Sequence, residues 1–316
     1  MLSRVGEWAV AWGRREKVFT NVYGLARTIL ALSTAMTLLA NGTGVLFRPG
    51  SGQMEYPKCS GSGAIGIFCL VPQSSIEWVR WLAILGLLVV ASGYRPRFTG
   101  ILHWWLSLSL NLNAIVLDGG DAVTAVLTLL LVPLTLADRR KWHWDDDDAP
   151  TGTTVDDARR ILARTTVLLI RVQVAGIYFH AAAAKFGVDE WSDGTALYYF
   201  FGSSFVGPSG VVAGLLKPLL ANGTTLALMT WSVIVFEFAL AAALVMEKRF
   251  RGWFLVAGIA FHVAIAVIHG ITSFACAMTA ALILYLRPFE RPFVLVLARA
   301  VRARVSALLP ATSTFR

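Results

Sequence analysis

The sequence predicts an all-α, polytopic membrane protein, and its composition and hydrophobic pattern support this prediction. Of the 316 residues, 56% are hydrophobic and only 15% are charged, and the mean hydropathy is +0.65. A soluble domain of this size cannot bury so much apolar surface. Windows of about 20 apolar residues, the length at which a helix crosses a bilayer, recur along the chain. We therefore expect about eight transmembrane helices, with an interfacial or re-entrant segment between helices 5 and 6.

The charged residues predict the orientation of these helices. The predicted spans cover residues 19–45, 76–92, 100–117, 121–137, 164–185, 224–246, 252–269 and 271–286. Connections rich in lysine and arginine alternate with connections that contain few, so the positive-inside rule places both termini in the cytoplasm. The net charge of +9 then reflects topology, and the expected partner is the lipid bilayer of the cell membrane, not nucleic acid. Residues 1–290 are expected to form one transmembrane domain and residues 291–316 a basic cytoplasmic tail.

Two of the three cysteines lie in the first external connection. Cys59 and Cys69 flank a Gly/Ser-rich stretch that faces an oxidising compartment under this topology. A disulfide bond is expected there, and two free thiols are the alternative. No metal site is expected, because histidine and acidic ligands are not nearby. The acidic run at residues 145–148 is interpreted as a solvated cytoplasmic loop, with a docking site for a basic partner as the alternative.

Three ionisable residues lie in predicted spans toward the cytoplasmic side: Arg27, Arg171 and Glu237. Counting about 1.5 Å of rise per residue from the end of each span places all three about 10 Å from that surface. Opposite charges at a similar depth predict a structural ion pair or triad between helices, because an unpaired charge is costly inside a membrane. A functional role is the alternative.

The other polar groups of the spans gather toward the outer side and suggest a functional site. The spacing of seven residues between Asn111 and Asp118, and between His262 and His269, returns to nearly the same helix face. The candidate catalytic residues are Lys185, His180, Asp118 and Asp121. The candidate substrate-binding or cofactor-binding residues are Asn111, Asn113, Tyr178, Trp191, Asp193, His262 and His269.

Lys185 follows four alanines at the end of the fifth predicted span, in the stretch YFHAAAAKFGVDEWSDG. One interpretation is that its ammonium group extends to the lipid headgroups, as it does for most lysines at helix ends. The other is a buried general base. Residues 191–220 are rich in aromatic side chains and contain an apolar segment too short to span, which is typical of an interfacial or re-entrant lid. Under such a lid, desolvation disfavours the charged form of a lysine.

Two stretches resemble the horizontally-transferred-transmembrane-domain (HTTM) superfamily, which includes the vitamin K-dependent γ-carboxylases. The stretch NLNAIVLDGGD, residues 111–121, resembles the Asn-rich Gly-Gly-Asp segment of that superfamily. The stretch YFHAAAAK, residues 178–185, is similar to its Tyr-Phe-x-Ala-Gly-x-x-Lys motif, with alanine in place of the glycine. The carboxylases also have a functional histidine near the Asn-rich segment. This chain has the segment but no histidine near it. The chain length and the two-cysteine loop resemble the branch of sporulation-delaying protein B.

This resemblance implies a function and a role for the lysine. Lys185 would be the base that deprotonates a quinol, either menaquinol or a compound similar to vitamin K hydroquinone. The chain would mature a secreted, toxin-like peptide precursor at the outer half of the membrane, together with a small cytoplasmic protein of the SdpA type. The alternative is a non-catalytic membrane subunit, of chaperone or immunity type, that binds such a peptide. A transporter is less favoured, because the sequence lacks a matching pair of Gly/Pro-interrupted spans.

Overall fold

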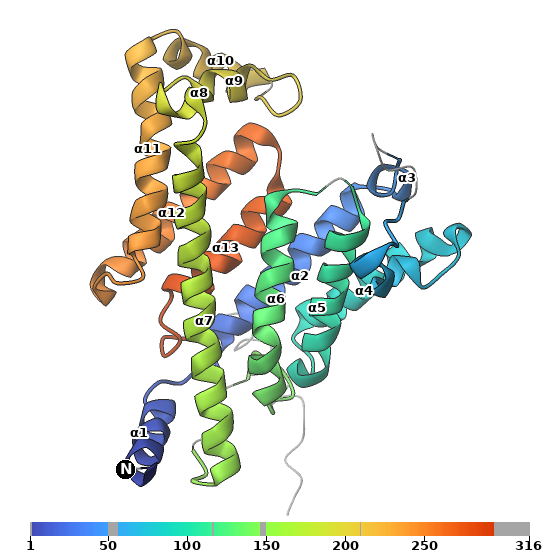
Figure 1. Ribbon diagram of the computed structural model, residues 1–316, viewed down its shortest axis with the longest axis vertical. Helices are drawn as coiled ribbons and strands as arrows, with labels where there is room; N and C mark the ends of the chain where they lie inside the picture. Colours follow the sequence, from blue (N-terminus) through green and yellow to red (C-terminus); the bar gives the residue numbers. More distant parts are fainter. Residues whose placement is uncertain (1, 50–55, 116, 146–149, 209, 294–316) are drawn as a thin grey trace, which may run out of the picture.

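The computed structural model describes residues 2–49, 56–115, 117–145, 150–208 and 210–293, and these residues form a helical bundle without β-strands (Figure 1). The long helices are α1 (Leu2–Arg14), α2 (Asn21–Ala40), α4 (Ile76–Ser92), α5 (Pro96–Asn113), α6 (Gly119–Ala137), α7 (Thr154–Lys185), α10 (Gly210–Leu220), α11 (Gly223–Ala242), α12 (Lys248–His269) and α13 (Thr272–Leu286). The short ones are α3 (Thr43–Leu46), η1 (Gly61–Ile65), η2 (Ile67–Cys69), η3 (Gln73–Ser75), α8 (Asp189–Ser192) and α9 (Ala196–Gly202).

Each of the predicted spans corresponds to one helix of the bundle. Within the described ranges, six helices are long and apolar enough to cross a membrane, namely α2, α4, α6, α7, α11 and α12. The chain is therefore a multi-pass membrane protein. The other two predicted spans, α5 and α13, do not meet this criterion, because α13 has only 15 residues and α5 is less apolar.

The short helix α13 lies in the middle of the bundle, where it packs against α2, α6, α7 and α12. All its side chains from residue 280 to residue 286 are buried. Alanine residues and Gly258 of α12 let the neighbouring helices approach closely, because a Cβ atom on Gly258 would lie 2.8 Å from the Leu282 side chain. A helix enclosed by other helices does not have to match the thickness of the lipid, which accounts for its length.

The longest helix, α7, begins earlier than the sequence predicted, at Thr154 and not at residue 164. Its first part lies outside the apolar window and packs against α1. The Arg14 guanidinium contacts the Asp157 carboxylate at 2.6 Å, and the Arg164 guanidinium lies 4.5 Å from the ring centre of Trp12. The ten residues from 154 to 163 add about two to three turns to the predicted span, and Figure 1 shows this end of α7 beside α1.

The segment predicted to be interfacial or re-entrant consists of α8, α9 and α10. These helices lie together at the end of the bundle where α7 ends and α11 begins (Figure 1). Contacts with α11 hold all three in place, and the Trp231 indole nitrogen donates a hydrogen bond to the Ser192 carbonyl oxygen at 3.2 Å. We call residues 189–220 the cap. Of its three helices, only α9 has buried residues, Ala196 and Leu197, whereas α8 and α10 have none.

The connection between α3 and α4 contains the predicted disulfide bond between Cys59 and Cys69, which the structure confirms. The side-chain amide of Asn113, the last residue of α5, organises this loop. It donates hydrogen bonds to the carbonyl oxygens of Lys58 and Gly63, both at 2.9 Å, and lies 3.2 Å from the Cys69 sulfur. The loop thus occupies the donor group of Asn113, whereas its Oδ1 has no hydrogen-bond partner among the described residues. A role of Asn113 in binding a substrate or a cofactor stays a prediction.

The basic connections lie together at one end of the bundle. Contacts at this end join the α11–α12 connection to the α1–α2 connection through Lys248 and Glu16, and the α4–α5 connection to residues after α6 through Tyr94 and Trp142. The disulfide loop and the cap lie at the other end (Figure 1). This arrangement agrees with the alternating charge of the connections, whereas the orientation of the termini stays a prediction. Residues 146–148 of the acidic run, and residues 294–316 of the predicted basic tail, lie outside the described residues.

We expect Asn113→Ala to destabilise the disulfide loop, because the two hydrogen bonds from the Asn113 amide to the carbonyl oxygens of Lys58 and Gly63 are lost. The loss should be about 1–3 kcal/mol, measured by thermal unfolding of the purified protein in detergent. Asn111→Ala is the matched control, because the Asn111 side chain makes no hydrogen bond to the described residues and is only partly buried. Equal effects of the two substitutions would contradict the role assigned to Asn113.

The topology predicts that the cap and the α11–α12 connection lie on opposite sides of the membrane. Phe205 and Arg249 are both well exposed, so each can be replaced by cysteine in a chain in which Cys276 is alanine. In intact cells an impermeant maleimide should label Phe205→Cys, and Arg249→Cys only after the cells are lysed. The reverse pattern would overturn the predicted orientation.

Candidate functional site

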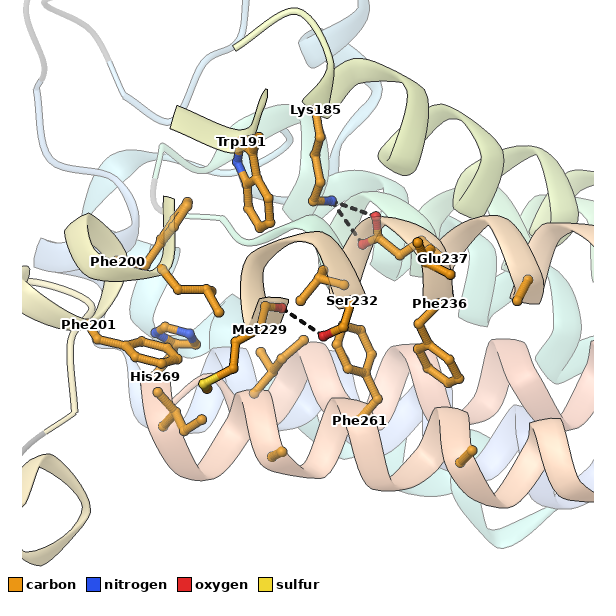
Figure 2. Close-up of a pocket in the computed structure, with 18 of the residues that line it drawn as sticks. Lys185, Trp191, Phe200, Phe201, Met229, Ser232, Phe236, Glu237, Phe261 and His269 are labelled. Atoms are coloured by element: carbon orange, nitrogen blue, oxygen red, sulfur yellow. Dashed lines mark hydrogen bonds and ion pairs between the residues drawn. The ribbon is translucent and has the colours of Figure 1, made fainter. Parts of the chain in front are cut away.

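A large apolar cavity lies between α11 and α12, under the cap. Its volume is about 1090 Å³, which is at the upper end of the range of small-molecule sites. The cavity exists because α11 packs mainly on α7, and α12 mainly on α13, so that these two helices diverge. Figure 2 shows the side chains that line it, most of them aromatic or aliphatic, with Phe200 and Phe201 from the cap and Phe236 and Phe261 on the facing helices.

The charged end of the cavity is formed by Lys185 and Glu237. The Lys185 ammonium donates hydrogen bonds to the two carboxylate oxygens of Glu237 at 2.7 and 2.9 Å (Figure 2). It donates another to the Ala181 carbonyl oxygen at 3.2 Å. It also lies 5.0 Å from the ring centre of Trp191, in the cap. Both side chains of the pair are mostly buried, with 18% and 10% of their surface exposed. Lys185 therefore does not extend freely to the headgroups.

The pairing of Glu237 with Lys185 follows from the buried stripe of α11. The buried residues of this helix are Leu226, Thr230, Ile234, Glu237 and Leu240. Their spacing places them on one helix face, the face that packs against α7. Glu237 belongs to this stripe, so its carboxylate faces the end of α7.

The prediction that Glu237 pairs with Arg27 or Arg171 is wrong. It assumed that every helix ends in a common plane, whereas α11 extends past the carboxyl end of α7 (Figure 1). The middle of α11 therefore lies beside Lys185, the last residue of α7. Arg171, two helical turns along α7 from Arg164, lies instead above the ring of Phe289, at 5.7 Å from its centre.

Arg27 is fully buried and has neutral partners. Its guanidinium donates a hydrogen bond to the Thr99 hydroxyl at 2.7 Å and lies 3.4 Å from Nδ1 of His143. Burial, together with the charges of Arg27 and Arg140, lowers the pKa of His143 to about 2. The imidazole is therefore neutral and can accept a hydrogen bond from the arginine. This cluster fixes residues 138–145 under α2 and α5, and we assign it a structural role.

A second polar pair, Tyr178 and His262, lies behind the ion pair. The Tyr178 hydroxyl is 2.8 Å from Nε2 of His262, and both side chains are buried. Tyr178 is two helical turns before Lys185 on the same face of α7. Its hydroxyl group is close enough to Glu237 to interact electrostatically with the carboxylate. Nδ1 of His262 is buried without a hydrogen-bond partner among the described residues. Neither residue lines the cavity, so this pair supports the site from behind.

Asp118 and Asp121 form the beginning of α6 and do not line the cavity. Asp118 accepts hydrogen bonds from the backbone N–H groups of Gly120 and Asp121, and Asp121 accepts one from the backbone N–H of Asp118. Their side chains also accept hydrogen bonds from the Ser273 and Thr37 hydroxyls, at 2.8 and 3.1 Å. A Cβ atom on Gly120 would lie 2.7 Å from the backbone of Phe274 in α13. The Gly-Gly-Asp stretch thus joins three helices, and its contacts are those of a capping box.

The remaining candidates divide between the cavity and other places. Trp191 and His269 line the cavity, and Nδ1 of His269 is 2.6 Å from the Val206 carbonyl oxygen of the cap. Asp193 accepts hydrogen bonds from Thr195 and shapes the turn before α9. His180 is exposed on α7 and does not line the cavity, and neither does Asn111. Among the described residues, no group of three or more His, Cys, Asp or Glu side chains could hold a metal ion.

Most of the cavity lining has no distinguishing pattern in the sequence. Met229, Phe236 and Phe261 are apolar residues in apolar spans, where a side chain that faces a cavity looks the same as one that faces lipid. Ser232 also lines the cavity, and its hydroxyl group donates a hydrogen bond to the Met229 carbonyl oxygen of the same helix. Only the aromatic residues that follow Lys185 indicated a covered site.

Comparison with known proteins identifies relatives over most of the chain. The HTTM domain family matches residues 148–289, which contain Lys185, Glu237 and the whole cavity. The chain is 38% identical to the Bacillus subtilis protein YitO, which is described as uncharacterized, over 92% of each chain. It is 35% identical to the sporulation-delaying protein SdpB of Bacillus subtilis, over 86% of this chain and 82% of SdpB. No solved structure matches the chain. The chain therefore belongs to the SdpB-like family of HTTM membrane proteins.

Proposed function

We propose that this protein is an enzyme that modifies a secreted peptide at the outer half of the membrane, with the Lys185–Glu237 pair as its proton-transferring group. One observation carries the proposal: the only strongly polar end of an apolar cavity of about 1090 Å³ is an ion pair that the cap covers. The similarity to a sporulation-delaying protein supports a role with a peptide of that kind. A small cytoplasmic protein is proposed as the partner.

The geometry of the Lys185–Glu237 pair supports a role in proton transfer, in addition to its role as an ion pair between two helices. A proton can pass from Lys185 Nζ to a Glu237 oxygen across 2.7 Å, which leaves a neutral amine. This amine can take a proton from a ligand hydroxyl placed at the same end of the cavity, and the regenerated ammonium then faces the negative charge left on the ligand. The net change is the transfer of one proton from the ligand to Glu237.

The cavity fits an amphiphilic cofactor of the quinol class. Its lining offers aromatic and aliphatic surface along α11 and α12, and Trp191 lies beside the ion pair where a ring could stack. A quinol held there would supply reducing equivalents for the modification. Exposed lining residues such as Val235 and Trp253 place the cavity at the lipid-facing surface of the bundle, so a lipid-soluble cofactor could enter from the bilayer.

A non-catalytic subunit that binds a peptide is the second candidate function. The exposed apolar residues of the cap favour it, since Phe205, Val211 and Leu215 are 97%, 79% and 69% exposed. The intact masses of peptides secreted by cells with and without this protein separate the two functions. A mass difference supports the enzyme, whereas unchanged mass with a changed amount of peptide supports the binding subunit.

Lys185→Arg and Lys185→Met should both fold and both lose the modifying activity. Arginine keeps the positive charge but stays protonated, so it cannot pass a proton to Glu237. Methionine keeps the apolar stem and removes the ammonium. We expect a loss of about 100-fold or more in the modified fraction of the secreted peptide, measured by mass spectrometry. Full activity of Lys185→Arg would show that charge alone suffices and would end the proposed proton transfer.

Replacing both Lys185 and Glu237 distinguishes the effect of the pair on protein stability from its effect on activity. Glu237→Leu alone leaves the ammonium without a partner, which should cost about 3 kcal/mol or less at this partly exposed site. The double variant Lys185→Met/Glu237→Leu should restore the unfolding temperature without restoring activity. If the double variant is active, the pair is only structural. The exposed pair of Glu247 and Arg249, 2.8 Å apart, is the matched control, and Arg249→Met should change neither property.

A further inference from the structure

A group of charged side chains gathers at the end of the bundle opposite the cap. We call it the inner basic cluster, and it consists of Arg164 and Arg171 from α7, Lys248 and Arg251 from α12, Glu16 from the α1–α2 connection and Glu290 after α13. Four of the six side chains are cationic and two are acidic, so positive charge is in excess by two. Nothing in the proposed function uses this cluster.

Three of the four cations have their hydrogen-bonding groups occupied. Lys248 contacts Glu16 at 3.2 Å and Glu290 at 3.8 Å. Arg164 contacts Glu16 at 3.7 Å and donates to the Trp12 carbonyl oxygen. Arg251 donates hydrogen bonds to backbone carbonyl oxygens at the end of α11, at 3.0 and 3.3 Å.

Arg171 differs from the other three. Its contact with the Phe289 ring is its only close interaction with the described residues, and its buried Nε has no hydrogen-bond partner there. Its guanidinium lines a small cavity of about 80 Å³, together with Glu16, Arg164 and Phe289. Glu16 lines the same cavity but pairs with Lys248 and Arg164 and forms no ion pair with Arg171. A guanidinium with no ion pair of its own is costly to bury, so this cavity is suited to hold an anionic group.

We propose that the inner basic cluster binds a phosphate group, with Arg171 as its principal ligand. A guanidinium matches the geometry of phosphate oxygens with two parallel hydrogen bonds. The excess of two positive charges can accommodate the single charge of a phosphodiester. Leu168, which is 45% exposed, also lines the small cavity, and it gives a surface along which an acyl chain can lie. The phosphate can belong to an anionic phospholipid of that leaflet or to free inorganic phosphate.

Thermal unfolding of the full-length protein tests the proposal. The protein is purified in neutral detergent and heated with phosphatidylglycerol, with phosphatidylcholine or with inorganic phosphate. A ligand that binds the folded state raises the unfolding temperature. Stabilisation by phosphatidylglycerol beyond that by phosphatidylcholine identifies a lipid headgroup, and stabilisation by inorganic phosphate alone identifies the free anion. The absence of both effects would overturn the proposal.

Two variants with opposite expected effects locate the site. Arg171→Gln should weaken the binding of the stabilising ligand by about tenfold, because a charge-assisted pair of hydrogen bonds is lost. Glu16→Gln should strengthen it, because a competing negative charge is removed from the same cavity. A misfolded variant would lose affinity and not gain it. A gain in Glu16→Gln therefore excludes misfolding as the cause of the changes. Arg249→Gln, an exposed residue near the cluster that is paired with Glu247, is the control and should leave affinity unchanged. If Arg171→Gln keeps the wild-type affinity, or Glu16→Gln does not raise it, the site is wrongly assigned.

Discussion

A charge inside an apolar interior requires a partner, and this constraint determines how the helices of this protein meet. Lys185 and Glu237 satisfy it by pairing with each other, which joins the end of α7 to the middle of α11. Arg27 satisfies it with a hydroxyl and a neutral imidazole. Because the Lys185 ammonium and the Glu237 carboxylate must meet, their pairing determines the height of α7 relative to α11. That height places the polar end of the cavity directly under the cap.

The cavity follows from the same arrangement. Glu237 directs the buried face of α11 toward α7, while α12 packs on the central helix α13. The two helices consequently diverge and leave an apolar space, which α8 and α9 cover. In such a low-dielectric space an ion pair acts strongly on any polar group brought beside it. The arrangement suits a ligand with a long apolar part and one ionisable oxygen, and it agrees better with chemistry on a membrane-soluble compound than with transport of a hydrophilic solute.

The two family motifs have different tasks in the structure. The stretch from Asn111 to Asp121 builds the external loop and the beginning of α6, through Asn113 and the two aspartates. The stretch from Tyr178 to Lys185 supplies the polar end of the cavity and the tyrosine behind it. A motif of polar residues in a membrane protein therefore does not by itself indicate chemistry. Polar groups at helix ends also satisfy backbone hydrogen bonds that no water can reach.

The sequence by itself determined the helical membrane class, the order of the spans, the disulfide between Cys59 and Cys69, and the position of Lys185 at the end of an apolar span. Hydrophobic length, cysteine placement and a charge in an apolar span are local properties. It did not determine the partner of Glu237, the task of Asn113 or the aromatic lining of the cavity. Each of these depends on the relative height and rotation of helices that are distant in the chain. Residue counts along one helix cannot supply that information, because packing between helices, and not the end of each span, sets how far α11 extends past α7.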